Sequence, residues 1–246
     1  MTGFLLVVLF PLIAGLGFGG AKALLPRLFK GGRGYQILAR QSGWIYLFLL
    51  SIPVALILFQ GVRDHTLRLM GVRWPEIPYL PPWAAIGLAG AMAWLAGVLL
   101  YLNELILSFK ARQLVGTASH PRLAAFVEGQ TASLSGQSST FGNFMSLGLL
   151  ISLGEEFLWR GFLIYFLTVH LAVVVPVAVL ITALLFGINH AYFGARNVFL
   201  KAIDGVVWGG LLVATSSLLA PFLSHLTFQY LVWRRMRRRA VLKAAA

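Results

Sequence analysis

The sequence contains no cysteine among its 246 residues. This absence excludes disulfide bonds, thiolate catalysis, cysteine-ligated zinc and lipid attachment at cysteine. Acidic residues are also scarce, since Asp and Glu together number seven, and charged residues of both signs make up only 11% of the chain. So few charges exclude the polar surface that an ordinary soluble domain of this length needs.

Long hydrophobic runs are what the chain has instead of charge. Hydrophobic residues make up 59% of the sequence, and the mean hydropathy is +0.84. The runs are continuous and do not alternate, which favours helices over a transmembrane β-barrel. We predict an all-α fold, a polytopic transmembrane helix bundle of about seven spans. The expected spans cover residues 4–25, 43–59, 83–107, 144–169, 171–190, 198–216 and 218–233.

Two connections between these spans carry most of the remaining polar residues. Residues 61–82 combine charges with apolar residues and prolines, and we predict an interfacial segment there. Residues 108–143 are the most polar part, and we expect an amphipathic helix around Pro121–Glu128 followed by a flexible loop. The predicted division is an N-terminal transmembrane region (1–143), a core (144–235) and a basic tail (236–246).

Basic residues outnumber acidic ones and give a formal net charge of +13. In membrane proteins such residues gather on the cytoplasmic side. The arginine-rich run at 234–239 directly follows a span, so we place the C-terminus in the cytoplasm and the N-terminus outside. This pattern indicates membrane lipids, and no nucleic acid, as the partner of the basic residues. The expected location is a membrane, with a bacterial inner membrane favoured.

Two adjacent carboxylates, Glu155 and Glu156, interrupt the fourth expected span. A charge inside a bilayer costs about 2.5–3.5 kcal/mol on insertion scales, so the default explanation is function. On an α-helix Glu156 and Arg160 share one face and can pair. Glu155 points about 100° away and has no local partner, which suits a general base near neutral pH. The alternative is an ion pair that only fixes helix packing.

Two histidines also fall within or at the end of expected spans, His190 and His225. A lone histidine in a span is most simply a hydrogen-bonding group between helices. Together with Glu155 the two histidines fit three chemistries: water activated for attack on a peptide carbonyl, a zinc ion held by Glu155, His190 and His225, or a proton relay in a carrier. Lys201 and Asp204, three residues apart in the sixth span, support the carrier but are more simply an ion pair.

Three motifs occur in order in the second half of the chain. Glu155, Glu156 and Arg160 form E-E-x-x-x-R, Phe186 and His190 form F-x-x-x-H, and His225 is followed four residues later by Gln229. These resemble the motifs of the CPBP family of intramembrane glutamic proteases, which includes CAAX prenyl protease 2 enzymes and bacterial abortive-infection and bacteriocin-processing proteins. The family has Asn or Asp at the place of Gln229. The resemblance covers residues 148–231.

The resemblance implies a role for each matching residue. Glu155 and His190 would activate a water molecule, and His225 and Gln229 would form the oxyanion site. Glu156 and Arg160 would be a structural pair, with Phe186 and Asn189 in support. Gln229 keeps the amide N–H donor on one more methylene than Asn.

We therefore expect an intramembrane endopeptidase that needs no metal or other cofactor. Its substrate would be a protein or peptide with a membrane-proximal or lipid-modified segment. The alternatives are a zinc-dependent site, a non-proteolytic membrane interaction or immunity protein with the same fold, and a proton-coupled carrier.

Overall fold

The computed structural model describes residues 33–116, 141–191 and 195–245. In these ranges the regular elements are all helical, in agreement with the predicted all-α fold. The expected first span at 4–25 and the expected amphipathic helix around Pro121–Glu128 lie outside the described residues.

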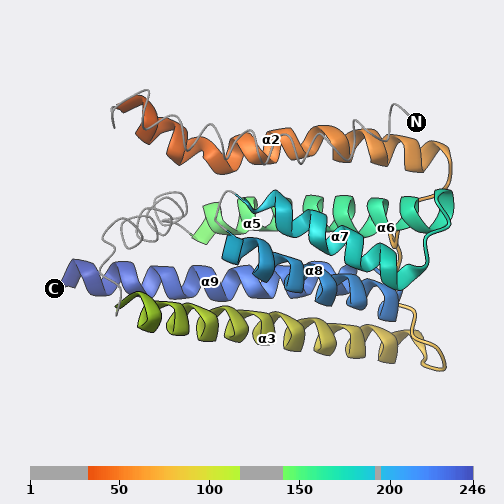
Figure 1. Ribbon diagram of the computed structural model, residues 1–246. Coiled ribbons are helices and arrows are strands. Elements are labelled where there is room, and N and C mark those ends of the chain that lie inside the picture. The colour runs from red at the N-terminus through yellow and green to blue at the C-terminus, as the bar shows by residue number, and fades with distance from the viewer. Residues whose placement is uncertain (1–32, 117–140, 192–194, 246) are drawn as a thin grey trace.

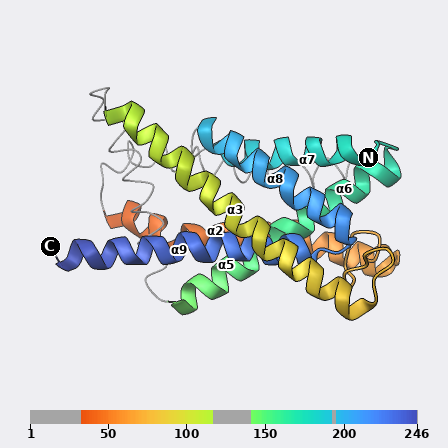
Figure 2. The same cartoon turned by 90° about the horizontal axis from the view of Figure 1, so that it is seen from below.

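The helices run roughly across the view of Figure 1, and Figure 2 shows that several of them cross one another obliquely. Helix α2 borders one side of the bundle, and α3 and α9 border the other. In chain order the elements are α2 (Arg33–Arg63), α3 (Pro82–Gly116), α5 (Phe141–Glu156), the π-helix η1 (Phe157–Phe162), α6 (Leu163–Tyr165), the π-helix η2 (Phe166–His170), α7 (Val175–Asn189), α8 (Ala195–Thr215) and α9 (Leu219–Ala245).

Three of the described helices contain stretches long and apolar enough to cross a membrane, namely Tyr46–Arg63, Pro82–Leu107 and Arg196–Thr215. They correspond to the second, third and sixth expected spans. Helix α7 is apolar but shorter, and it begins four residues later than expected because Pro176 stands in its first turn after an extended Val174. The predicted total of about seven spans is not confirmed.

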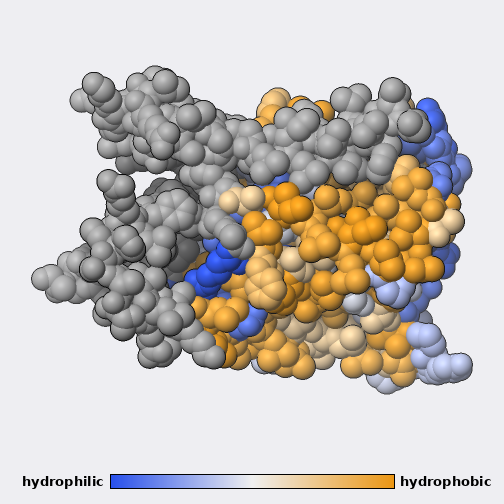
Figure 3. Space-filling model, in the orientation of Figure 1, coloured by the Kyte–Doolittle hydropathy of each residue, from blue (hydrophilic) through white to orange (hydrophobic). Residues whose placement is uncertain are grey.

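A broad apolar surface covers the middle of the face seen in Figure 3, over the residues that are coloured there. Large hydrophobic side chains are exposed on several helices, for example Phe59 (71%) and Trp83 (78%). A soluble protein rarely exposes so much contiguous apolar surface, whereas a bilayer requires it. Hydrophilic residues gather at the edge of the molecule where α2 ends and the connection to α3 begins. This surface identifies an integral membrane protein.

Glycines allow the central helices to approach one another closely. A Cβ atom at Gly205 of α8 would lie 2.7 Å from the Cα of Ala183 in α7, and one at Gly97 of α3 would lie 2.6 Å from the carbonyl oxygen of Ser224 in α9. Small residues at such contacts are typical of membrane helix pairs. Figure 2 shows α3 crossing α9 obliquely, so Gly97 fixes the distance between α3 and the helix that carries His225.

The fourth expected span is one continuous helical stretch, but its character changes directly after Glu156. Helix α5 ends there, and η1 continues the chain with a hydrogen bond from the Leu163 N–H to the Leu158 carbonyl. Such i→i+5 turns are rare and often mark functional sites. A period of 100° per residue, which predicts an α-helix over the whole span, does not predict these i→i+5 turns.

The connection between α2 and α3 is not helical and packs against the corner between α8 and α9. The Glu76 N–H donates to the Thr215 carbonyl at 2.9 Å, and the Leu218 N–H donates to the Gly71 carbonyl at 2.9 Å. Gly71 has φ +84°, a conformation that favours glycine. This corner lies at the start of α9, so the connection ties α2 to the helix that carries His225 and Gln229.

Candidate functional site

Glu155 lies at the end of α5, with only 4% of its surface exposed. The helical spacing predicts no partner for Glu155 on its own helix, and the structure supplies one from another helix. The hydroxyl group of Tyr46 in α2 donates a hydrogen bond to Glu155 Oε1 at 2.6 Å. The other oxygen, Oε2, lies 3.8 Å from Nε2 of His225. Glu155 therefore has one oxygen held by Tyr46 and the other facing a histidine.

Glu156 is fully buried and forms the predicted pair with Arg160, with Nη1 and Oε1 separated by 3.4 Å. It has a second partner that sequence reasoning missed. Nδ1 of His225 lies 2.8 Å from the same Oε1 atom. Because a carboxylate only accepts hydrogen bonds, this contact places a proton on Nδ1 of His225. Glu156 thus connects the E-E-x-x-x-R motif to the histidine of α9.

Gln229, one turn after His225 on α9, places its amide Nε2 3.1 Å from Nε2 of His225. With the histidine proton on Nδ1, the amide N–H of Gln229 donates to the unprotonated Nε2 atom. Nε2 of His225 therefore faces both Gln229 and Glu155. In this tautomer His225 is an acceptor at Nε2, and it becomes an oxyanion donor only when Nε2 takes up a proton.

Aromatic side chains surround the Arg160 guanidinium and the His225 ring. The guanidinium lies 4.2 Å above the ring centre of Phe186 and 5.0 Å from that of Trp208. Trp208 stacks on His225 with ring centres 4.0 Å apart, and its indole N–H donates to Ser224 Oγ at 3.0 Å. These rings fix the plane of His225 and favour the cation by cation–π interactions.

His190 follows the last residue of α7. Its Nδ1 atom lies 2.8 Å from the carbonyl oxygen of Phe186, and its ring packs edge-on against the Phe186 ring at 4.7 Å. The Phe186 ring also lies 6.5 Å from that of His225, so one phenylalanine contacts both histidines. Asn189, the neighbour of His190, donates from Nδ2 to the Tyr46 hydroxyl oxygen at 3.4 Å.

Three of these buried polar side chains, Glu156, Arg160 and Asn189, have polar atoms that form no hydrogen bond within the described residues, and both Nη atoms of Arg160 are among them. Glu156 Oε2 and Asn189 Oδ1 accept no hydrogen bond from the part of the protein that the structure describes. Buried acceptors without partners are unusual and suit a site that binds water or substrate.

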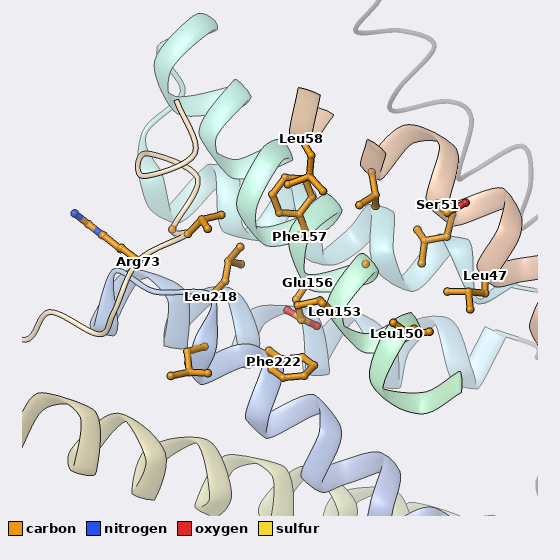
Figure 4. A pocket seen from close by; sticks show the side chains of 16 residues that line it. Leu47, Ser51, Leu58, Arg73, Leu150, Leu153, Glu156, Phe157, Leu218 and Phe222 are labelled. Atoms are coloured by element: carbon orange, nitrogen blue, oxygen red, sulfur yellow. The ribbon is translucent and has the colours of Figure 1, made fainter. Parts of the chain in front are cut away.

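A pocket of about 530 Å³ lies between α2, α5 and the start of α9. Its walls are almost entirely apolar, and Figure 4 shows Glu156 among leucine and phenylalanine side chains of these helices. The α2 wall comprises Leu47, Leu50, Ser51, Val54 and Leu58. The opposite walls are formed by residues of α5 and η1, such as Leu150 and Phe157, and by Leu218, Leu219 and Phe222. An apolar pocket therefore meets the buried site at Glu156.

The remaining expectations concern a metal and the pair in α8. Within the described ranges, no three His, Asp or Glu side chains are arranged so that they could hold a metal ion, so the Glu155, His190 and His225 triplet is not such a cluster. Lys201 and Asp204 form the predicted ion pair at 2.7 Å, and the Lys201 ammonium lies 4.1 Å from the ring centre of Phe228. Both lie in α8 and are hydrogen-bonded to each other. Within the part of the chain that the structure describes, neither forms a hydrogen bond to Glu155 or His225.

Sequence reasoning missed Tyr46 because it lies in the part of the chain where no motif is visible. One signal was available: a tyrosine hydroxyl inside the apolar run 43–59 needs a hydrogen-bond partner when it is buried. The sequence does not say which partner, since Tyr46 and Glu155 are 109 residues apart in the chain.

Comparison with known proteins gives a family match for the region that carries the three motifs. No curated protein and no solved structure matches the chain. Residues 137–231 match a family model described as type II CAAX prenyl endopeptidase Rce1-like. The match spans Glu155, His190, His225 and Gln229, and it excludes Tyr46. Over residues 137–231, which are less than half of the chain, the protein is therefore similar to the Rce1-like type II CAAX prenyl endopeptidases.

Proposed function

We propose that the protein is an intramembrane endopeptidase of the glutamic type, in which Glu155 activates a water molecule for attack on a peptide bond. The observation that carries the proposal is the buried Glu155 carboxylate, with Oε2 3.8 Å from Nε2 of His225. That distance is too long for a direct hydrogen bond, and a water molecule beside the line between the two atoms reaches both. The family match supports the reaction class.

The proposed reaction is peptide hydrolysis. Oε2 of Glu155 takes a proton from water while the water oxygen bonds to the carbonyl carbon. The carbonyl oxygen becomes an oxyanion, which the amide N–H of Gln229 stabilises together with His225 in its imidazolium form, whose proton on Nε2 comes from solvent before the substrate binds and stays on the ring through the cycle. The C–N bond then breaks, and Glu155 returns its proton to the leaving amine. Glu156 supports the stabilisation of the oxyanion, because its carboxylate accepts a hydrogen bond from Nδ1 of His225 and stabilises the imidazolium form of that ring.

His190 enters the proposal through the family motif and its position on Phe186. Phe186 contacts the rings of both histidines, so a substrate that lies between them would meet His190 and His225 from one side. We assign His190 to the activation of the water together with Glu155. Phe186 and Asn189 are supporting residues.

The substrate is a protein or peptide with an apolar, membrane-proximal or lipid-modified segment. The apolar pocket supports this class, because a charged or strongly hydrated segment would lose its water there without replacement hydrogen bonds. The pocket meets the site at Glu156, so a segment bound there would hold a neighbouring peptide bond close to Glu155.

The proposed enzyme uses no metal ion and works in a bacterial inner membrane. Metal-free chemistry is part of the proposal because the proposed reaction uses only the Glu155 carboxylate, the His225 ring and the Gln229 amide. The arginines after Trp233 support a cytoplasmic C-terminus. Metal analysis of purified active protein tests the first point: about one zinc per chain, with activity lost on chelation, would overturn it.

The deciding experiment compares membranes of cells that produce the wild type, Glu155→Gln or Glu104→Gln. Glu104 is a carboxylate in α3 outside the site and is the matched control for the change of acid to amide. Mass spectrometry of protein termini should find at least one membrane-associated protein that is shortened with the wild type and Glu104→Gln and remains intact with Glu155→Gln. A protein that is shortened in all three membranes, and intact in cells that lack this protein, would overturn the role of Glu155.

One observation favours a second candidate function. Gln229 stands where the family has Asn or Asp, and its amide is engaged with His225. A chain that keeps the fold without turnover would serve as a membrane interaction or immunity protein. Protein termini that are the same in all three membranes as in cells lacking this protein, with all three variants folded and present at equal levels, would favour this function.

A further inference from the structure

Helix α2 lies outside the region that matches the family, yet it contacts the proposed general base directly. The Tyr46 hydroxyl and Glu155 Oε1 are 2.6 Å apart, a short distance for a hydrogen bond to a carboxylate. Glu155 is almost completely buried, so this bond is not exchanged for one to bulk water. The hydrogen bond from Tyr46 therefore restrains the position of the Glu155 carboxylate.

The packing of α2 on α5 explains why Tyr46 reaches Glu155. Leu50 lies one turn after Tyr46 on the same face of α2. Leu50 packs against Gly154, the neighbour of Glu155, where an added Cβ would lie 2.8 Å from Leu50 Cδ2. A side chain at 154 would push against Leu50, so glycine allows α2 to lie close enough for the tyrosine hydroxyl to reach the carboxylate.

The bond to Tyr46 distinguishes the two oxygens of Glu155. The terminal torsion of a glutamate is broad and roughly two-fold, so a carboxylate without a partner turns easily. With Oε1 fixed by Tyr46, Oε2 is the oxygen that faces Nε2 of His225. This is the oxygen that the proposed reaction requires to be near the water and the substrate carbonyl.

Asn189 determines the direction of the tyrosine proton. Its Nδ2 group donates to the Tyr46 oxygen at 3.4 Å. A phenol oxygen that accepts from an amide keeps its own proton for another acceptor, here Glu155. Asn189 precedes His190, so α7 contributes to the orientation of Glu155 through Tyr46.

We infer that Tyr46 is a positioning residue for the general base, which fixes Glu155 through Oε1 so that Oε2 points to the water and to His225. The inference rests on the proposed function. It extends the functional unit beyond residues 137–231, because one of the hydrogen bonds that orient the base comes from α2. It assigns Asn189 to the same chain of hydrogen bonds.

Tyr46→Phe is the direct test, because it removes one oxygen and keeps the ring. The substrate is the protein or peptide found by comparing wild-type and Glu155→Gln membranes. Per folded molecule, kcat should fall by about 10- to 100-fold, since a misplaced base loses rate while apolar substrate binding is unchanged. KM should stay within about threefold of the wild type. Tyr165→Phe, a change at another buried tyrosine, is the matched control and should leave kcat unchanged.

A second arm separates positioning from a merely structural role. Asn189→Ala should lower kcat by less than Tyr46→Phe, and in the Tyr46→Phe background it should have no further effect on kcat, because both act through the same hydroxyl. Equal kcat for Tyr46→Phe and the wild type, or fully independent effects of the two changes, would overturn the inference and leave the proposed function in place. A wild type that cleaves nothing beyond what is cleaved in cells lacking the protein would overturn the proposed function itself.

Discussion

Oε1 of Glu156 contacts two nitrogen atoms from different helical segments, Nδ1 of His225 at 2.8 Å and Nη1 of Arg160 at 3.4 Å. The family resemblance implies only the second contact, as a structural pair. The first contact gives Glu156 the position of the carboxylate that orients the histidine in a catalytic triad. One carboxylate thus holds a buried cation and fixes the tautomer of a proposed catalytic residue.

Changing Glu156 should therefore affect both stability and rate. Glu156→Gln leaves Arg160 as a buried cation without its counter-charge and removes the negative charge that stabilises protonated His225. We expect a lower melting temperature and, per folded molecule, a kcat lower by at least about tenfold. Thermal unfolding in detergent and cleavage assays measure the two effects. Full kcat with reduced stability would show that Glu156 acts only through Arg160.

Arg160 should matter mainly for stability. Arg160→Ala leaves Glu156 buried without its cation, which costs about 3–5 kcal/mol in similar cases. Arg160→Lys keeps the charge but loses the planar group that lies above Phe186 at 4.2 Å. Its free energy of unfolding should therefore lie between those of Arg160→Ala and the wild type. Denaturant unfolding of the three proteins measures the order of their stabilities. An Arg160→Lys variant as unstable as Arg160→Ala would show that stacking matters more than charge.

Gln229 should be needed for rate because its amide donates to Nε2 of His225. Gln229→Leu has a similar size without a donor, and we expect kcat to fall by about 100-fold, as for other lost oxyanion-site donors. Gln229→Asn restores the residue of the family motif and keeps the amide, so it should retain kcat within about tenfold of the wild type. A Gln229→Leu variant with normal kcat would remove Gln229 from the proposed site.

The contact between α3 and α9 should be sensitive to a single methyl group. Gly97→Ala would place Cβ 2.6 Å from the backbone oxygen of Ser224, which cannot move aside, so we expect a loss of about 1–3 kcal/mol. Gly90→Ala in the same helix is the control, because nothing lies within 4 Å of its Cβ, and it should be neutral or stabilising. Unfolding curves of both variants check the difference. Equal stability would mean that α3 and α9 are less closely packed.

The ion pair in α8 should be structural. Asp204→Asn leaves Lys201 without its counter-charge, and a loss of about 1–3 kcal/mol is expected because Lys201 is partly exposed. Per folded molecule, kcat should be unchanged. Proton uptake by vesicles that contain the wild type should equal that of empty vesicles. Proton movement that depends on Asp204 would instead support the carrier.

The contacts that the sequence predicted are local. Glu156 with Arg160 and Lys201 with Asp204 are three or four residues apart, so the period of a helix is enough to bring them together. The apolar runs likewise predicted the all-helical fold, because backbone groups in a bilayer must be satisfied within each segment.

The contacts that the sequence did not predict depend on how distant helices pack. Tyr46 with Glu155 and His225 with Glu156 require the register between α2 and α5 and between α5 and α9. Nor does hydropathy reveal that η1 replaces the α-helix after Glu156, since a π-turn changes hydrogen bonding without changing composition. The motifs identified the residues of the proposed site, while packing between helices decides which atoms meet.

Helix α2 presents Tyr46 to Glu155 and, one turn later, Leu50 to the apolar pocket. Selectivity and rate are therefore linked on a single helix. An engineer who reshapes the α2 wall to admit a bulkier segment would also shift the donor of the general base. Variants selected for new substrates at these positions should lose turnover even when they bind well, and compensating changes should appear where α2 touches Gly154.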